Sequence, residues 1–102
     1  MLPLLLISFV FLGPLQEELL FRGFLFRGFA PSLGVWPTTV ITAALWALIH
    51  VQYQWFFVCE IFALGLAFGY LRARSGSLFL TIGLHAAVNA MAVVEAALMA
   101  GP

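Results

Sequence analysis

The chain has 102 residues, of which 65% are hydrophobic and 8% are charged, and its formal net charge at pH 7 is zero. A mean hydropathy of +1.15 excludes a soluble domain of this size, because so few charges cannot coat a water-facing surface. The sequence also lacks a basic patch, so we expect no nucleic-acid partner. It predicts an all-α integral membrane protein, surrounded by the lipid bilayer, with residues 1–102 forming a single domain.

Four hydrophobic segments predict a transmembrane bundle of about four helices. The first extends from about Leu4 to Phe29, the third from Trp55 to Leu71 and the fourth from Leu78 to about Met99. The second, Pro37 to about Val51, has about fifteen residues and a helical length of roughly 22 Å, too short for a full crossing. We therefore expect His50, near its end, to lie recessed within the membrane.

Prolines and glycines punctuate these segments. Pro14 should kink the first helix, and the turn-rich residues 30–37 should close it, with Pro37 at the start of the next helix. Gly65 and Gly69 have the spacing of closely packed membrane helices, which we interpret as structural. The chain begins directly in hydrophobic sequence without the basic region of a signal peptide, so we expect it to be truncated at the N-terminus relative to a longer protein.

The arginines predict the orientation. Counted alternately across the segments, Arg27 and the loop that carries Arg72 and Arg74 fall on the same side of the membrane. By the positive-inside rule this side is cytoplasmic, and we expect the protein in the plasma membrane. The oligomeric state stays open.

Two carboxylates and an arginine interrupt the first segment. Burying such charges costs several kcal/mol unless they are paired, hydrated or neutralised. Glu18 and Arg22 lie four residues apart and can pair on one helix face, whereas Glu17 points about 100° away. One glutamate is thus predicted to be structural and the other free. A pair that merely fixes helix packing is the alternative.

Polar residues of three segments lie at a similar depth. Counted from the arginine-bearing side, Glu17 and Asn89 lie roughly 18 Å deep, His50 roughly 20 Å and His85 roughly 12 Å. His85 and Asn89 are neighbours on one helix face, as are Trp46 and His50. We expect these residues to surround one cavity.

The residue types suit hydrolysis. A carboxylate and an imidazole can deprotonate water, while a second imidazole and a carboxamide can donate to an oxyanion. Glu17, His50 and His85 could instead hold zinc, but no His-Glu-x-x-His motif is present and we expect no cofactor. Ser8 and Cys59 lack neighbouring bases, so covalent catalysis is not expected. Cys59 should be a buried, inert thiol.

Two further glutamates have weaker signals. Glu60 lies roughly 18 Å deep when counted from Arg72, and we interpret it as a structural partner for a buried arginine or hydroxyl rather than as a catalytic group. Glu95 should approach the opposite surface and be solvated.

Three motifs stand in order along the chain: Glu17-Glu18-x-x-x-Arg22, Trp46-x-x-x-His50 and His85-x-x-x-Asn89. Together they resemble the CAAX protease and bacteriocin-processing family of intramembrane proteases, the Abi or type II CAAX prenyl endopeptidase group. The resemblance covers the chain from Pro14 to about Asn89.

The resemblance implies a glutamate-dependent endopeptidase that acts on peptides or membrane-tethered, including prenylated, proteins. Glu17 and His50 would activate the attacking water, and His85 and Asn89 would stabilise the oxyanion. Glu18 would complete this catalytic set by supporting the site together with Arg22, and Trp46, which stands where the family usually has Phe, would be a further supporting residue. A non-catalytic membrane immunity factor or adaptor with the same fold is the alternative.

Overall fold

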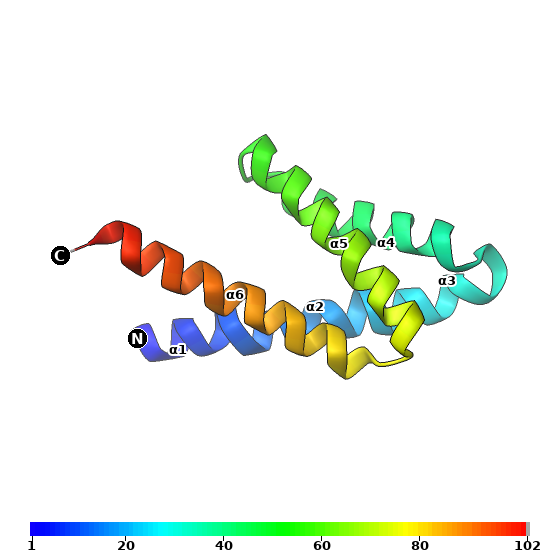
Figure 1. The fold of residues 1–102 in the computed structure, drawn as a ribbon, viewed down its shortest axis with the longest axis horizontal. Coiled ribbons are helices and arrows are strands. Elements are labelled where there is room, and N and C mark those ends of the chain that lie inside the picture. Colours follow the sequence, from blue (N-terminus) through cyan, green and yellow to red (C-terminus); the bar gives the residue numbers. More distant parts are fainter. Residues whose placement is uncertain (102) are drawn as a thin grey trace.

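The computed structural model describes residues 1–101, in which helices occupy nearly the whole length and no strand occurs (Figure 1). Residues Leu2–Leu33 form one continuous helical rod, called the first rod below. It is built from α1 (Leu2–Ile7), the π-helical η1 (Ser8–Leu12), α2 (Gly13–Glu18), the π-helical η2 (Leu19–Leu25) and α3 (Phe26–Leu33).

The two π-helical stretches flank α2, which carries both adjacent glutamates. At the end of η1 the Gly13 N–H reaches back five residues to the Ser8 carbonyl. Pro14, which has no N–H to donate, follows directly. Because the hydrogen bonds before Pro14 already span five residues instead of four, the helix continues through Pro14. Single wide turns of this kind are frequent at functional sites.

The first rod extends beyond its predicted end. It continues through Pro31 to Leu33, and only Gly34, with φ of 88°, reverses the chain. The predicted turn over residues 30–37 is thus wrong except at Gly34, because Pro31 lies in the last turns of α3, where its missing N–H removes one helical bond. Pro37 lies in the first turn of α4 (Val35–Leu48), as predicted.

The remaining helices are α5 (Trp55–Ser75) and α6 (Leu78–Ala100). Between them Gly76 is left-handed, with φ of 67°, and the Ser77 hydroxyl caps α6 by accepting the Leu80 N–H at 3.1 Å. The first rod, α5 and α6 are long and apolar enough to span a membrane, whereas α4 is shorter. The predicted all-α membrane bundle with a short second helix is confirmed, and the chain is an integral membrane protein.

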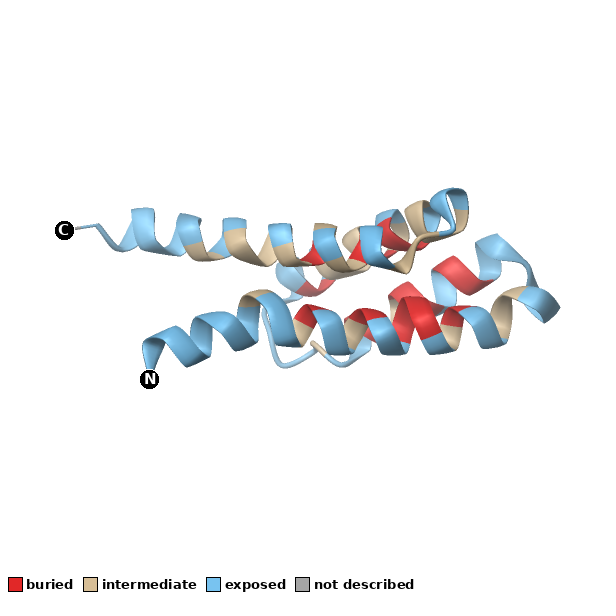
Figure 2. Cartoon of the chain, turned by 90° about the horizontal axis from the view of Figure 1, so that it is seen from below, coloured by how far each residue is buried: buried red, intermediate tan, exposed pale blue. Residues whose placement is uncertain are grey.

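The four helical units meet in one half of the molecule. The first rod and α6 run side by side in opposite directions, with both termini at one end, while α4 and α5 form a closely packed hairpin (Figure 1). Buried residues gather in the half of the bundle away from the termini (Figure 2). The centre of the core consists of Phe21, Trp46 and Phe68.

The outer surface is largely apolar, as expected of a protein surrounded by lipid. Cys59 belongs to this surface, so the prediction of a buried thiol is wrong. Its side chain lies about 120° around α5 from Gly65, which faces α4. An apolar run does not reveal which helix face meets lipid and which meets protein.

The paired glycines of α5 allow its close approach to α4. A β-carbon added at Gly65 would lie 2.8 Å from the Ala43 Cβ and 3.0 Å from the Arg22 Nη2, and one at Gly69 would lie 2.7 Å from the Thr39 Cγ2. The interpretation of Gly65 as merely structural is therefore incomplete, because this glycine also makes room for the buried Arg22 guanidinium.

We predict that Gly65→Ala destabilises the protein by about 1–3 kcal/mol, since the added methyl group overpacks the contact between α4 and α5. Gly83→Ala on α6 is the matched control, because a β-carbon there meets nothing within 4 Å. Thermal unfolding in detergent should show a lower midpoint for Gly65→Ala only. Equal midpoints for the two variants would contradict the steric argument.

Candidate active site

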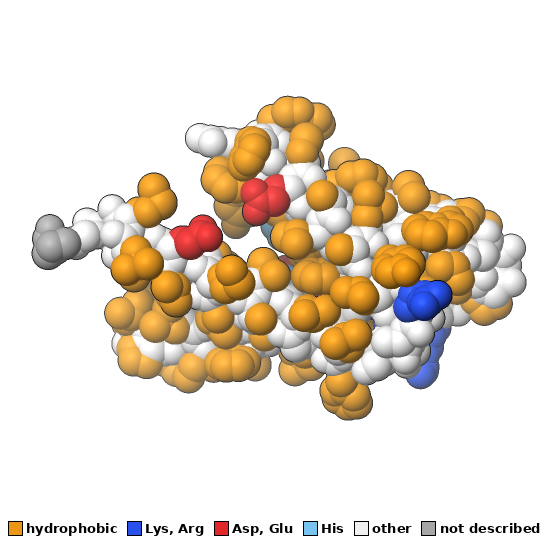
Figure 3. All heavy atoms as spheres, in the orientation of Figure 1, with side chains coloured by type: hydrophobic (Ala, Val, Ile, Leu, Met, Phe, Trp, Pro, Cys, Tyr) orange, Lys and Arg blue, Asp and Glu red, His pale blue; other side chains and the backbone are white. Residues whose placement is uncertain are grey.

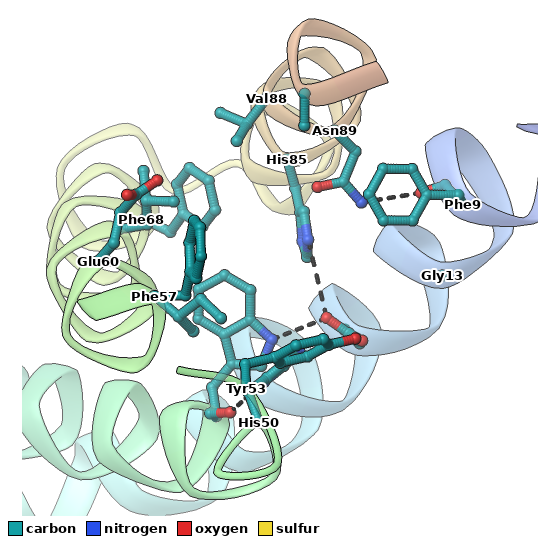
Figure 4. Close-up of a pocket in the computed structure, with 15 residues that line it drawn as sticks. Phe9, Gly13, His50, Tyr53, Phe57, Glu60, Phe68, His85, Val88 and Asn89 are labelled. Carbon is teal, nitrogen blue, oxygen red and sulfur yellow. Dashed lines mark hydrogen bonds and ion pairs between the residues drawn. The ribbon is translucent and has the colours of Figure 1, made fainter. Parts of the chain in front are cut away.

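A cavity of about 520 Å³ lies where the first rod, α4, α5 and α6 meet, and Figure 4 shows the residues that line it. In the space-filling view the molecular surface is hollowed beside acidic side chains (Figure 3). The polar lining of the cavity includes the four residues that the sequence predicts around one cavity. Aromatic and aliphatic side chains from all four helical units complete the wall. The polar lining residues are Glu17, His50, Tyr53, Glu60, His85 and Asn89.

Beneath the cavity Glu18 and Arg22 form the predicted ion pair. Arg22 Nη1 donates to Glu18 Oε2 at 3.1 Å, and both side chains are fully buried. The same oxygen accepts the His85 Nδ1–H at 2.8 Å. The guanidinium carbon lies 4.5 Å from the ring centroid of Trp46 and 5.4 Å from that of Phe68, so aromatic faces provide much of the remaining cation stabilisation.

Glu17 is held at one oxygen and faces the cavity. The Trp46 indole N–H donates to Glu17 Oε1 at 2.7 Å, and His85 Nε2 lies 3.7 Å from the same oxygen (Figure 4). The Glu17 side chain is 31% exposed, whereas that of Glu18 is fully buried. The two adjacent glutamates thus have the different environments that the sequence predicts, and Glu17 is the one open to a ligand.

His50 follows the end of α4 and presents one free ring nitrogen. Its Nδ1 lies 2.7 Å from the Trp46 carbonyl oxygen, which can only accept, so Nδ1 is the donor of this bond and Nε2 is left without a hydrogen-bond partner among residues 1–101. The ring stacks on Tyr53, with centroids 5.9 Å apart. Tyr53 was not among the predicted site residues; its position three residues after His50, in the short polar connection, is the signal that could have indicated it.

The Asn89 side chain donates a hydrogen bond to a backbone carbonyl of the first rod. Its Nδ2 donates to the Phe9 carbonyl at 2.8 Å. That carbonyl lacks a helical partner, because the Gly13 N–H bonds to Ser8 and Pro14 has no N–H. One of the two amide N–H groups of Asn89 is therefore used, and the other remains for a ligand in the cavity.

The surroundings of Glu60 differ from those that the sequence predicts. It is exposed on α5 at the cavity wall, and no arginine or hydroxyl group among residues 1–101 pairs with it, so the predicted structural partnership is wrong. Glu60 lies about 140° around the helix from Gly65, which places it away from the buried face of α5. Glu95 is exposed, as predicted.

Glu17, His50 and His85 are the residues that would have to hold a zinc ion at this site. Within the part of the chain that the structure describes, no group of three or more His, Cys, Asp or Glu side chains could hold a metal ion. His85 and His50 each use Nδ1 in a hydrogen bond, to the Glu18 carboxylate and the Trp46 carbonyl respectively. These bonds leave Nε2 as the nitrogen of each ring that is open to a ligand in the cavity.

Comparisons with known proteins give two matches. A family model described as "Type II CAAX prenyl endopeptidase Rce1-like" matches residues 1–91. A protein of Escherichia coli described as "Uncharacterized 24.3 kDa protein" is 38% identical over 85 residues, which are 80% of this chain and 39% of that protein. The chain therefore spans about two fifths of the length of this relative. No solved structure gives a significant match.

We predict that Arg22→Ala destabilises the protein by about 3 kcal/mol or more, because it leaves the Glu18 carboxylate buried without its cation. The double variant Arg22→Ala/Glu18→Gln removes the orphaned charge and should recover part of this loss. Unfolding midpoints in detergent measure both effects. An Arg22→Ala midpoint equal to that of the parent would show that the pair does not support the fold.

Proposed function

The chain belongs to the Rce1-like family of type II CAAX prenyl endopeptidases, and we propose that it forms the catalytic core of an intramembrane endopeptidase. Its substrates would be peptides or membrane-associated proteins, including prenylated proteins of the CAAX type. The observation that carries the proposal is the position of Glu17, which faces the cavity lined also by His50 and Asn89.

In the proposed reaction a water molecule in the cavity loses a proton to the Glu17 and His50 pair. Glu17 Oε1 already accepts the Trp46 N–H, whereas Glu17 Oε2 and His50 Nε2 have no partner among residues 1–101 and can accept the proton. The water oxygen forms a bond to the peptide carbonyl carbon. When the C–N bond breaks, the same pair returns the proton to the leaving amine.

The oxyanion would be held by His85 and Asn89. Asn89 has one N–H left after its bond to the Phe9 carbonyl, and His85 can donate from Nε2 when that nitrogen is protonated. Hydrogen bonds to a developing charge are strong in a site shielded from water, because the local dielectric constant is low.

Glu18 and Arg22 would support these groups from beneath the cavity, and Trp46 would support them from the cavity wall. Glu18 orients the His85 ring through Nδ1, and Arg22 compensates the charge of Glu18. Trp46 contacts both halves of the proposed base, since its indole N–H binds Glu17 and its carbonyl binds His50. A phenylalanine at position 46 would keep the ring but lose the bond to Glu17.

The remaining expectations belong to the same proposal. The reaction would need no metal or other cofactor, and residues 1–102 would act as a single protease domain. The arginine-bearing end would face the cytoplasm, in agreement with the clustering of basic side chains at one end of the molecule (Figure 3).

We predict graded losses of activity on a quenched fluorogenic peptide that ends in a farnesylated CAAX sequence. Glu17→Ala and His50→Ala should abolish turnover, and Asn89→Ala should lower kcat about 10²- to 10³-fold with KM nearly unchanged. Glu95→Ala, at an exposed position outside the cavity, is the control and should match the parent. Full activity of Glu17→Ala would refute the glutamate mechanism, and an inactive but folded parent protein would favour the immunity or adaptor alternative.

We also predict that activity survives treatment with 1,10-phenanthroline and dialysis. The expected metal content by elemental analysis is far below stoichiometric, because no cluster of ligands gathers in the described residues. A zinc-dependent enzyme would behave differently: the chelator would silence it, and added zinc would restore turnover.

A further inference from the structure

A second backbone carbonyl of the first rod accepts a hydrogen bond from the side chain of a distant helix. Directly after η2 the Phe26 N–H bonds to the carbonyls of Phe21 and Gly23. In an α-helix this N–H would bond to Arg22. The Arg22 carbonyl instead accepts a hydrogen bond from Arg72 Nε at 3.1 Å, across fifty positions of the sequence.

Arg72 reaches this carbonyl because of the way α5 packs. It lies seven residues after Gly65 and three after Gly69, so all three share one face of the helix. The two glycines bring this face against α4 and the Arg22 side chain. The Arg72 guanidinium is half-buried, and its central carbon lies 5.8 Å from the ring centroid of Phe26.

Arg22 is consequently held at both ends. Its carbonyl is bonded to Arg72, and its guanidinium is bonded to Glu18. Glu18 Oε2 in turn accepts the His85 Nδ1–H, and the opposite ring nitrogen of His85 faces Glu17. A series of contacts thus connects the end of α5 to the cavity.

We infer that Arg72 is a positioning residue for the active site. Its hydrogen bond fixes the wide turn that carries Arg22, and thereby sets where Glu18 holds the His85 ring. This inference rests on the proposed function for its catalytic consequence, whereas the effect on His85 can be measured independently.

Arg74 is the control position, because its removal tests the general effect of positive charge without affecting the hydrogen bond that Arg72 makes. It lies in the same last turn of α5 and is exposed, and no hydrogen bond or ion pair joins its guanidinium to residues 1–101. Removing either arginine deletes one positive charge from the same end of the molecule. Only the removal of Arg72 leaves the Arg22 carbonyl without this donor.

The test compares Arg72→Ala, Arg72→Lys and Arg74→Ala in the purified protein. Arg72→Ala should lower kcat about 10- to 100-fold, as expected when a distant change misplaces a reacting group, with KM changed less than about twofold. Arg72→Lys can still donate to the carbonyl and should recover most of the loss. Arg74→Ala should match the parent.

Nitrogen-15 NMR of the imidazole rings provides a readout besides activity. The chain contains two histidines, so His50→Gln assigns the signals. Arg72→Ala should shift the His85 signals and Arg74→Ala should not. Unmoved His85 signals in folded Arg72→Ala, or equal effects of the two alanine variants, would overturn the inference. If the parent cleaves no peptide, the proposed function fails, and the NMR comparison still decides whether Arg72 positions His85.

Discussion

The buried contact between Glu18 and Arg22 is the constraint on which the rest of the structure depends. Two opposite charges with no exposed surface, inside a membrane-spanning helix, require each other and further polar or aromatic contacts. Trp46 and Phe68 lie against the cation, and Gly65 leaves the space that the guanidinium fills. The packing of α4 and α5 against the first rod is therefore adapted to one charged pair.

Regular helical geometry explains which features could be predicted from the sequence. Four-residue spacing places Glu18 beside Arg22 in any helix, so their ion pair could be predicted without knowing where the other segments lie. Apolar segment lengths likewise determine which helices can span a bilayer, and the short α4 ends where its composition indicates. Depth along each segment was enough to predict that Glu17 and His50 belong to one site.

Rotation around a helix and changes of backbone register were not predictable in this way. Helix α5 is apolar on nearly all sides, so its sequence has no periodicity that separates a lipid-facing from a protein-facing position; Cys59 and Glu60 were misplaced for this reason. The π-helical stretches are defined by backbone hydrogen bonds. The hydrogen bond from Asn89 to the Phe9 carbonyl forms because the π-helical register leaves that carbonyl without a helical donor, and side-chain spacing does not reveal this register.

The position of both members of the ion pair on one helix also bears on biosynthesis. Glu18 and Arg22 can pair as soon as the first rod forms, before the later helices leave the ribosome, so this rod enters the bilayer with that charge already compensated. Glu17 obtains its contacts from Trp46 and His85, which are synthesised later. During insertion its carboxyl group must be neutral or hydrated. Glu17 therefore raises the free energy of membrane insertion more than the Glu18–Arg22 pair does.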